Sequence, residues 1–461
     1  MKKLFLLALL LIPFKVYAED AKNLSKEAVY AINNNITTKF SDDNVKTNNT
    51  VSKDKEIKIS SNDKISHVYI IYEISSKTGT LKTDSEEIPL GSNGYLHEYQ
   101  KLTVPTDTLT LKYNEDVKIS EIKLYGEGDV PKDVQQWKTE TKTDLMIFST
   151  HADDEQLFFA GVMPTYINQG KKVHVVYLAR HDVGGYYAPN RLHEQLDGLW
   201  TLGVTDYPTF GLIPDAYSNG SNSLNIAISQ AKQAGFTEDD IIKFDVKAIR
   251  TYQPKVILGH DENGEYSHGQ HKLNTYTLKT AVEKAKDSNY IVDDLKPYDV
   301  PKFYIHLYDL DNKTVLDYDQ PLEKYDGKTA YEVSKEGYKK HLSQQYTWFT
   351  SWLNGKNNSY TSATQITTYN PAYWGLYYTT VGPDINKNDL FENIVEEKEE
   401  EKKTEEKTNK TTKVEEVSKY RRILNRFTLK TNLIAGTILF TSIVLIIVIK
   451  VKKHKKKKAT K

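Results

Sequence analysis

Four residues of types that commonly bind metals or move protons lie within five consecutive positions: His151, Asp153, Asp154 and Glu155. The apolar run 145–148 before them predicts a buried strand, and the apolar spacing after them predicts a helix. Adjacent acidic side chains in a strand-to-helix turn face different partners. One aspartate can therefore bind a metal while the other handles a proton, at the strand end where open α/β sheets place their ligands.

A second group of such residues, Tyr266, His268 and His271, follows the apolar run 256–258. The sequence His-Ala-Asp-Asp-Glu at 151–155 resembles the His-Pro-Asp-Asp-Glu signature of the zinc-dependent de-N-acetylases of the PIG-L (LmbE-like) family. Tyr-Ser-His-Gly-Gln-His at 266–271 resembles that family's Tyr-x-His-x-x-His signature. Two signatures in this order, each after a candidate strand, form a specific signal.

The resemblance implies a Zn²⁺ site with three protein ligands and a position for water. The implied ligands are His151, Asp154 and His271. Asp153 is implied as the general base. His268 and Tyr266 match the positions that polarise the carbonyl or protonate the leaving amine, and the sequence does not decide which residue does which.

Arg191 opens a predicted helix, and we expect it either to contact the sugar or to form a structural ion pair. The plainer interpretation of Asp153 and Asp154 is that one of them caps the helix that follows. Ala152 stands where the family has proline, which loosens the turn without removing a ligand. Four other histidines lack motif support and are interpreted as structural: His174, His181, His260 and His341.

Composition narrows the possible partners. The 62 basic and 62 acidic residues cancel, so net charge gives no indication of a nucleic-acid partner, and none is expected. The chain has no cysteine, which leaves histidines and carboxylates as its strong metal ligands. With 461 residues, it is expected to form two or three globular units.

The two ends of the chain predict a surface location. Residues 1–18 have the basic, apolar and small-residue regions of a secretory signal peptide. Residues 431–450 form an apolar stretch long enough for one transmembrane helix, and the lysines of the tail 451–461 predict a cytoplasmic C-terminus. Between this helix and the globular part, residues 394–430 are a charged spacer. The composition, rich in Lys, Asn and Ile, together with the signal peptide indicates a bacterium. The predicted location is therefore the bacterial cell membrane, with the globular domains outside the cell.

The globular part is predicted to contain two domains. Residues 23–130 carry short alternating strand candidates at 56–60, 66–72, 101–104, 108–113 and 119–125, a pattern typical of an all-β sandwich. This part loosely resembles discoidin-like (galactose-binding-like) domains, which implies either glycan binding or a packing role. Residues 141–393 alternate strands and helices, which predicts an α/β domain with a Rossmann-like, mostly parallel sheet.

Together these features predict a metal-dependent hydrolase that removes N-acetyl groups from N-acetylglucosamine-type sugars of a cell-surface or cell-wall glycan. Its expected partners are that glycan and the membrane. One alternative is a membrane-tethered glycan-binding or adhesion protein with an inactive hydrolase-like domain. Another is an amidase that acts on a non-sugar amide with the same metal chemistry.

Overall fold

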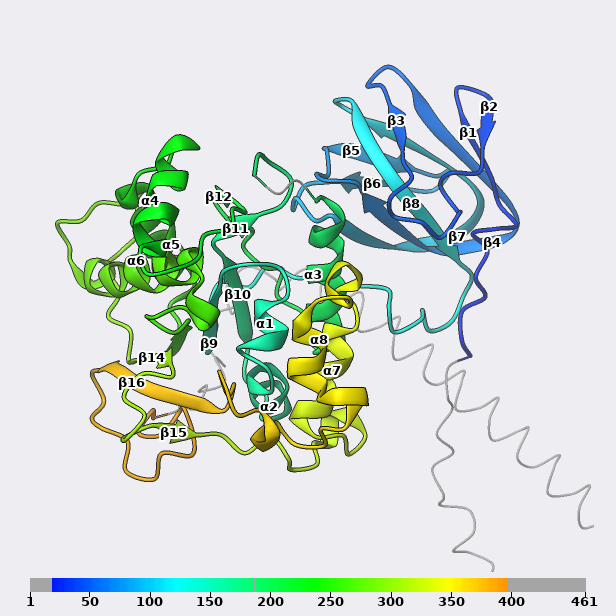
Figure 1. Ribbon diagram of the computed structural model, residues 1–461. Coiled ribbons are helices and arrows are strands. Elements are labelled where there is room, and N and C mark those ends of the chain that lie inside the picture. The colour runs from blue at the N-terminus through cyan, green and yellow to red at the C-terminus, as the bar shows by residue number, and fades with distance from the viewer. Residues whose placement is uncertain (1–18, 186–187, 396–461) are drawn as a thin grey trace, which may run out of the picture. The chain divides into compact units, whose positions relative to one another are not determined.

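The computed structural model describes residues 19–185 and 188–395, and the described residues up to Ile394 form one compact unit (Figure 1). The predicted signal peptide at 1–18 and basic tail at 451–461 lie outside the described residues, as does nearly all of the predicted spacer. A β-rich region comes first along the chain, and a region of mixed strands and helices follows it.

The β-rich region contains eight strands that pair only in the antiparallel sense. They are β1 (Val29–Ile32), β2 (Asn35–Thr37), β3 (Asn49–Val51), β4 (Glu56–Tyr72), β5 (Gly79–Lys82), β6 (Glu87–Leu90), β7 (His97–Tyr113) and β8 (Val117–Tyr125). The first half of β4 pairs with β1 and its second half with β8, while β7 lies along its other edge. This pairing confirms a β-rich N-terminal region, and its discoidin-like type stays a prediction.

The second region is built on a six-stranded sheet with the order β10-β9-β13-β14-β16-β15. Its parallel part consists of β9 (Leu145–Ser149), β10 (Val173–Tyr177), β13 (Val256–Gly259) and β14 (Lys302–His306). Two antiparallel strands, β15 (Thr314–Val315) and β16 (Tyr373–Thr379), complete one edge, and the two-residue β11 (Ala179–Arg180) and β12 (Ile213–Pro214) pair separately. Four consecutive strands, from β10 at one edge to β14, are parallel, as the strand and helix alternation predicted.

Within the part of the chain that the structure describes, eight α-helices connect and cover these strands. They are α1 (Asp154–Leu157), α2 (Val162–Asn168), α3 (Asn190–Thr201), α4 (Ser223–Gln233), α5 (Glu238–Tyr252), α6 (Gly269–Lys286), α7 (Ala330–Tyr338) and α8 (Trp348–Asn354). The sheet is buried on both faces because alternate β9 residues enter different apolar clusters, Leu145 and Ile147 one cluster, Met146 and Phe148 the other.

The order of the strands determines where the site lies. The chain runs from β9 outward to β10 and then returns to the opposite side of β9 as β13. The carboxyl ends of β9 and β13 therefore form a topological switch point, where open α/β sheets bind their ligands. His151 follows β9, and the N-terminus of α6 carries His268 and His271 close behind β13.

The predicted fold class is corrected in one respect. It included a single C-terminal transmembrane helix at 431–450, but no helix within residues 19–185 and 188–395 is long and apolar enough to cross a membrane. The predicted segment itself lies outside those residues. The described residues therefore form a mixed α/β fold with an N-terminal β-rich region.

Candidate metal centre

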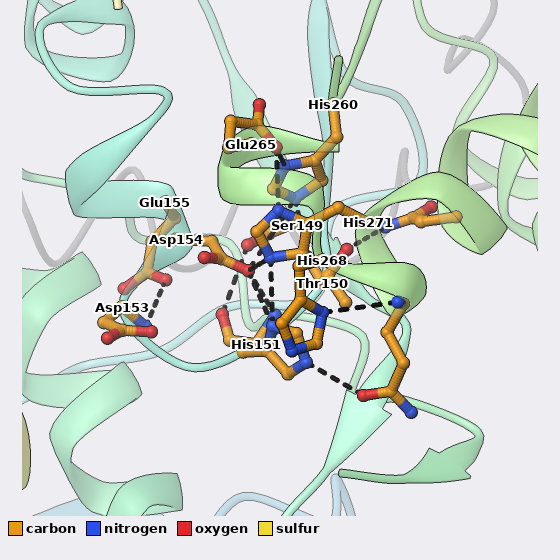
Figure 2. A network of polar contacts seen from close by, with 12 residues as sticks. Ser149, Thr150, His151, Asp153, Asp154, Glu155, His260, Glu265, His268 and His271 are labelled. Atoms are coloured by element: carbon orange, nitrogen blue, oxygen red, sulfur yellow. Dashed lines mark hydrogen bonds and ion pairs between the residues drawn. The ribbon is translucent and has the colours of Figure 1, made fainter. Parts of the chain in front are cut away.

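The three residues predicted to bind the metal lie together at the ends of β9 and β13 (Figure 2). The distances between their side-chain atoms are 3.0 Å from His151 Nδ1 to Asp154 Oδ2, 3.1 Å from Asp154 Oδ2 to His271 Nε2, and 3.2 Å from His271 Nε2 to His151 Nδ1. Tetrahedral zinc bonds of about 2.0–2.1 Å separate their ligand atoms by about 3.3 Å. The three atoms thus form one face of a site that fits such an ion.

The side chain of Gln270 fixes which nitrogen of His151 carries a proton. Its Oε1 accepts from the backbone N–H of Ala216 at 3.1 Å, and its Nε2 donates to the carbonyl of Pro214 at 2.9 Å. The amide orientation is set by these backbone partners, so the oxygen faces His151 Nε2 at 2.9 Å. His151 Nε2 is therefore the donor, and in the neutral imidazole Nδ1 keeps the lone pair for a metal.

Glu265 performs the same task for His271 and gathers two further histidines. His271 Nδ1 donates to its carboxylate at 2.7 Å, His260 Nδ1 at 2.9 Å and His306 Nδ1 at 2.6 Å. A metal-binding histidine commonly donates its other N–H to a carboxylate, which fixes the ring and its tautomer. In the neutral ring, His271 Nε2 thus carries the lone pair and faces Asp154.

The charges around the ligands favour a cation at this point. Burial alone would raise the pKa of Asp154, but His271 and His151 hold it well below its usual value. Burial would lower the pKa of His271, yet Asp154 and Glu265 raise it to about 10. A buried carboxylate therefore keeps its negative charge between two imidazoles, where a bound cation takes the place of protons.

Two other groups of three residues also lie close enough to hold a metal: His151, His268 and His271, and Asp154, His260 and His271. His260 is excluded as a ligand because Nδ1 donates to Glu265 while Nε2 accepts from the backbone N–H of Thr150 at 3.0 Å. His268 Nδ1 accepts from the backbone N–H of Gln270 at 3.3 Å, so the neutral ring carries its proton on Nε2. The predicted triad is the best set of lone pairs.

Asp153 does not cap the helix that follows it. It is the N-cap residue of α1, but its side chain makes no capping hydrogen bond, and its φ of 107° is rare for a residue other than glycine. Such strain is found at functional sites. Burial raises the pKa of Asp153 to about 7, Arg191 opposes this rise, and Asp154 adds to it. The carboxylate is therefore free of the helix and tuned near neutrality.

Arg191, at the start of α3, holds Asp153 in place. Its Nη2 contacts Asp153 Oδ1 at 3.1 Å and also bonds the carbonyl of Ala152, while its Nη1 contacts Asp215 Oδ2 at 3.5 Å. His181 Nδ1 lies 3.2 Å from the same Asp215 oxygen. The side chain of Arg191 is buried and forms ion pairs with two carboxylates, as the second of the two expectations for this residue had it. Arg191 also lines the cavity.

The backbone of Ala152 also explains how this chain manages without the family's proline. Its N–H donates to His181 Nε2 at 3.3 Å. A proline has no N–H and would leave that nitrogen without this partner. Compared with proline, alanine at this buried position therefore allows one more hydrogen bond in the turn.

A cavity of about 230 Å³ opens beside the triad. It is lined by His151, Asp153, Asp154, Arg191, Asp215, Tyr217, Tyr266, His268, Gln344 and Phe349. All the predicted site residues line this cavity except His271, which lies directly behind it. The ring of Tyr266 packs edge-on against His268 and His271, at 5.4 Å between centroids in both cases.

Several residues of this centre were missed from the sequence. Glu265 adjoins the second signature and Gln270 occupies one of its variable positions, and only the rule that ligand histidines need outer partners would have suggested them. Asp215 and His181 lie on loops without a motif. Three histidines interpreted as structural each contact a carboxylate of this centre: His181 contacts Asp215, His260 contacts Glu265 and His341 contacts Glu155.

The chain was compared with known proteins. Two relatives, both named 1D-myo-inositol 2-acetamido-2-deoxy-alpha-D-glucopyranoside deacetylase, are similar to it. The one from Saccharopolyspora erythraea (named deacetylase 2) is 26% identical over 176 residues, 34% of this chain and 63% of the relative. The one from Rhodococcus jostii is 27% identical over 182 residues, 35% of this chain and 60% of the relative. The chain thus spans less than two thirds of either relative.

Among solved structures, the N,N'-diacetylchitobiose deacetylase from Pyrococcus horikoshii is 15% identical, with a TM-score of 0.36, over 51% of this chain and 84% of that one. Residues 146–282 match the family model of PIG-L, described as GlcNAc-PI de-N-acetylase. The match includes both signatures, Arg191 and the residues that orient the ligands. Residues 146–282 therefore belong to the PIG-L family, as the two signatures predicted.

Proposed function

We propose that the chain is a zinc-dependent hydrolase that removes the N-acetyl group from N-acetylglucosamine-type sugars. One observation carries this proposal: the ligand atoms of His151, Asp154 and His271 lie within 3.2 Å of one another, at a cavity that the buried carboxylate of Asp153 also lines. A bound zinc ion would act as a Lewis acid and lower the pKa of a water molecule towards about 7.

The chain's own residues supply the proton transfers and the positioning. Asp153, held by Arg191, accepts a proton from the attacking water, and burial raises its pKa towards the range suited to a base. The same carboxyl can return that proton to the amine nitrogen, which leaves as the C–N bond breaks and acetate forms. His268 Nε2–H faces the cavity as a donor for the oxyanion that develops on the acetamide. Tyr266 packs against His268, so its ring and hydroxyl help to define the acetyl pocket.

The alternative of an inactive hydrolase-like domain is disfavoured for two reasons. The hydrogen bonds of His151 and His271 favour the tautomers that a metal needs, and the proposed ligand Asp154 and the proposed base Asp153 both line the cavity beside them. An N-acetylated glycan of the cell surface or wall is our proposed substrate, and that location rests on the secretory pattern of residues 1–18 alone. Detection of the mature chain outside the cell would test it.

The activity itself is tested with the full-length protein. The metal is removed with a chelator, zinc is added back, and acetate release from N-acetylglucosamine and its oligomers is measured. We expect the rate to vanish on stripping and to return with about one zinc per chain. His271→Ala should not recover. Unaltered acetate release by the stripped protein, or release from non-sugar acetamides alone, would contradict the proposal.

A further inference from the structure

Three aromatic side chains line the metal cavity or pack beside it, and we call them the aromatic rim: Tyr217, Trp348 and Phe349. Tyr217 lies between β12 and α4, and the other two begin α8. Tyr217 and Phe349 line the cavity, and Trp348 packs on Phe349 with 4.2 Å between ring centroids. No signature contains any of them, and α8 lies outside the segment that matches the family.

Two of these rings are presented to solvent. Tyr217 is 70% exposed and Trp348 is 49% exposed. Each nevertheless contacts a site residue through its edge: Tyr217 lies 5.5 Å from His268, and Trp348 lies 5.8 Å from Tyr266, measured between ring centroids. Large apolar side chains gathered in the open at the mouth of a polar cavity mark a binding surface.

The size of the cavity implies that part of the substrate lies on this surface. Its volume of about 230 Å³ is below the about 300–1,000 Å³ of pockets that enclose a drug-sized ligand. The cavity is thus suited to the single unit that reacts. A larger substrate must extend beyond the cavity, and the aromatic rim offers it an exposed surface there.

The chemistry of the rim favours a carbohydrate over a lipid chain. Amide groups stand among the rings: Asn219 Nδ2 donates to the hydroxyl of Tyr217 at 3.0 Å, and Gln344 lines the cavity beside Phe349. A sugar ring has an apolar C–H face and an edge of hydroxyls, so it needs aromatic faces and amides together. An alkyl chain would bind more favourably to an apolar surface without amide groups, because polar groups lose hydration when they are buried against it.

We infer that the aromatic rim binds the sugar units next to the reacting one, so that the substrate of this chain is an oligosaccharide or polysaccharide and not a single N-acetylated sugar. This inference rests on the proposed function and adds a chain-length preference to it. Rigid aromatic side chains suit this role because little conformational freedom is lost when they bind.

The test measures binding separately from turnover. Asp153→Asn protein loaded with zinc is titrated calorimetrically with N-acetylglucosamine, its β-1,4-linked tetramer and an alkyl glycoside of the monosaccharide. We expect the tetramer to bind more tightly than the monosaccharide. Adding Trp348→Ala or Tyr217→Ala should weaken tetramer binding by about threefold to tenfold, the scale of one aromatic stacking contact, and should weaken monosaccharide binding less.

Conservative variants and a matched control separate stacking from folding. Trp348→Phe and Tyr217→Phe keep a ring and should retain most of the tetramer preference. Tyr276→Ala removes a tyrosine that is 45% exposed on α6, outside the rim, and should leave the preference intact.

Equal affinity for tetramer and monosaccharide, or an unchanged preference in both alanine variants, would overturn the inference. Tightest binding of the alkyl glycoside would overturn it too, because the rim would then serve an apolar substituent. Absence of turnover on every N-acetylated sugar would instead count against the proposed function, since the binding results stand without turnover.

Discussion

At the residue scale, Glu265 is the carboxylate on which the centre depends, because three histidines donate to it. Glu265→Gln keeps the shape but removes the charge that orients His271. We expect zinc affinity to fall by about 10-fold to 100-fold, the usual effect of losing an outer partner of a metal ligand. Competition with a chelator of known affinity measures it. Glu262→Gln, an exposed glutamate three residues earlier, is the control and should bind zinc normally.

Binding of zinc should also release a proton. Burial lowers the pKa of His271, but Asp154 and Glu265 raise it to about 10, so the imidazole of the metal-free protein is protonated at pH 7. Zinc needs the neutral ring, so about one proton leaves per ion bound, and apparent affinity falls as pH falls. Calorimetry in buffers of different ionisation enthalpy counts the protons. A heat that does not depend on the buffer would refute this assignment.

These residues differ in how far sequence could predict them. That the proposed ligand triad lies together was predicted because each signature keeps its chemistry within six residues, so short-range spacing defines it. The roles of the triad and of Asp153 stay predictions. Asp215 reaches His181 and Arg191 because β11 and β12 pair. No local sequence pattern predicts these long-range contacts. Arg191 was placed correctly at a helix start, but only the fold shows that it holds Asp153.

At the element scale, α3 is connected to the β-rich region by a buried pair of histidines. His97 Nε2 lies 2.8 Å from His193 Nδ1, Tyr69 bonds the other nitrogen of His97 at 2.8 Å, and His193 Nε2 donates to the carbonyl of Glu73 at 2.9 Å. Arg191 is on the same helix. The β-rich region therefore helps to position the residue that holds Asp153.

This histidine pair predicts a loss of stability in acid. Burial lowers the pKa of His193 to about 4 and that of His97 well below its usual value. The unfolded chain binds these protons near pH 6.5, so unfolding becomes easier as pH falls below about 6.5, by up to about 1.4 kcal/mol per pH unit for each ring. Denaturant unfolding at pH 7, 6 and 5 measures the slope. In His193→Gln, which keeps both hydrogen-bonding groups, the slope should be shallower; an identical slope would contradict this account.

Element boundaries were predicted less well than element types. The strand candidates 56–60 and 66–72 are the two halves of β4, because pairing with β7 continues through register shifts between Ser60 and His67. The single helix expected after the first signature is divided into α1 and α2 at Gly161, whose φ is 86°. Such continuations and breaks depend on pairing partners and backbone strain, which apolar periodicity does not report.

At the scale of the whole molecule, the sequence predicted a β-rich region followed by a mostly parallel α/β sheet. Local apolar patterns predict such elements because they decide which faces are buried. The same patterns did not predict the bonds between the two regions, such as Leu96 N–H to the hydroxyl of Tyr207 at 2.9 Å. The transmembrane part of the prediction is the part that the described fold contradicts.

The central claim is that two adjacent aspartates of one turn do different work, one on the metal and one on the proton. The most direct measurement is zinc content together with acetate release in Asp153→Asn and Asp154→Asn. We predict that Asp153→Asn keeps about one zinc per chain while turnover falls by about 10²-fold or more, and that Asp154→Asn loses zinc and activity together. Loss of zinc from Asp153→Asn with retention in Asp154→Asn, or no change in either, would contradict the account.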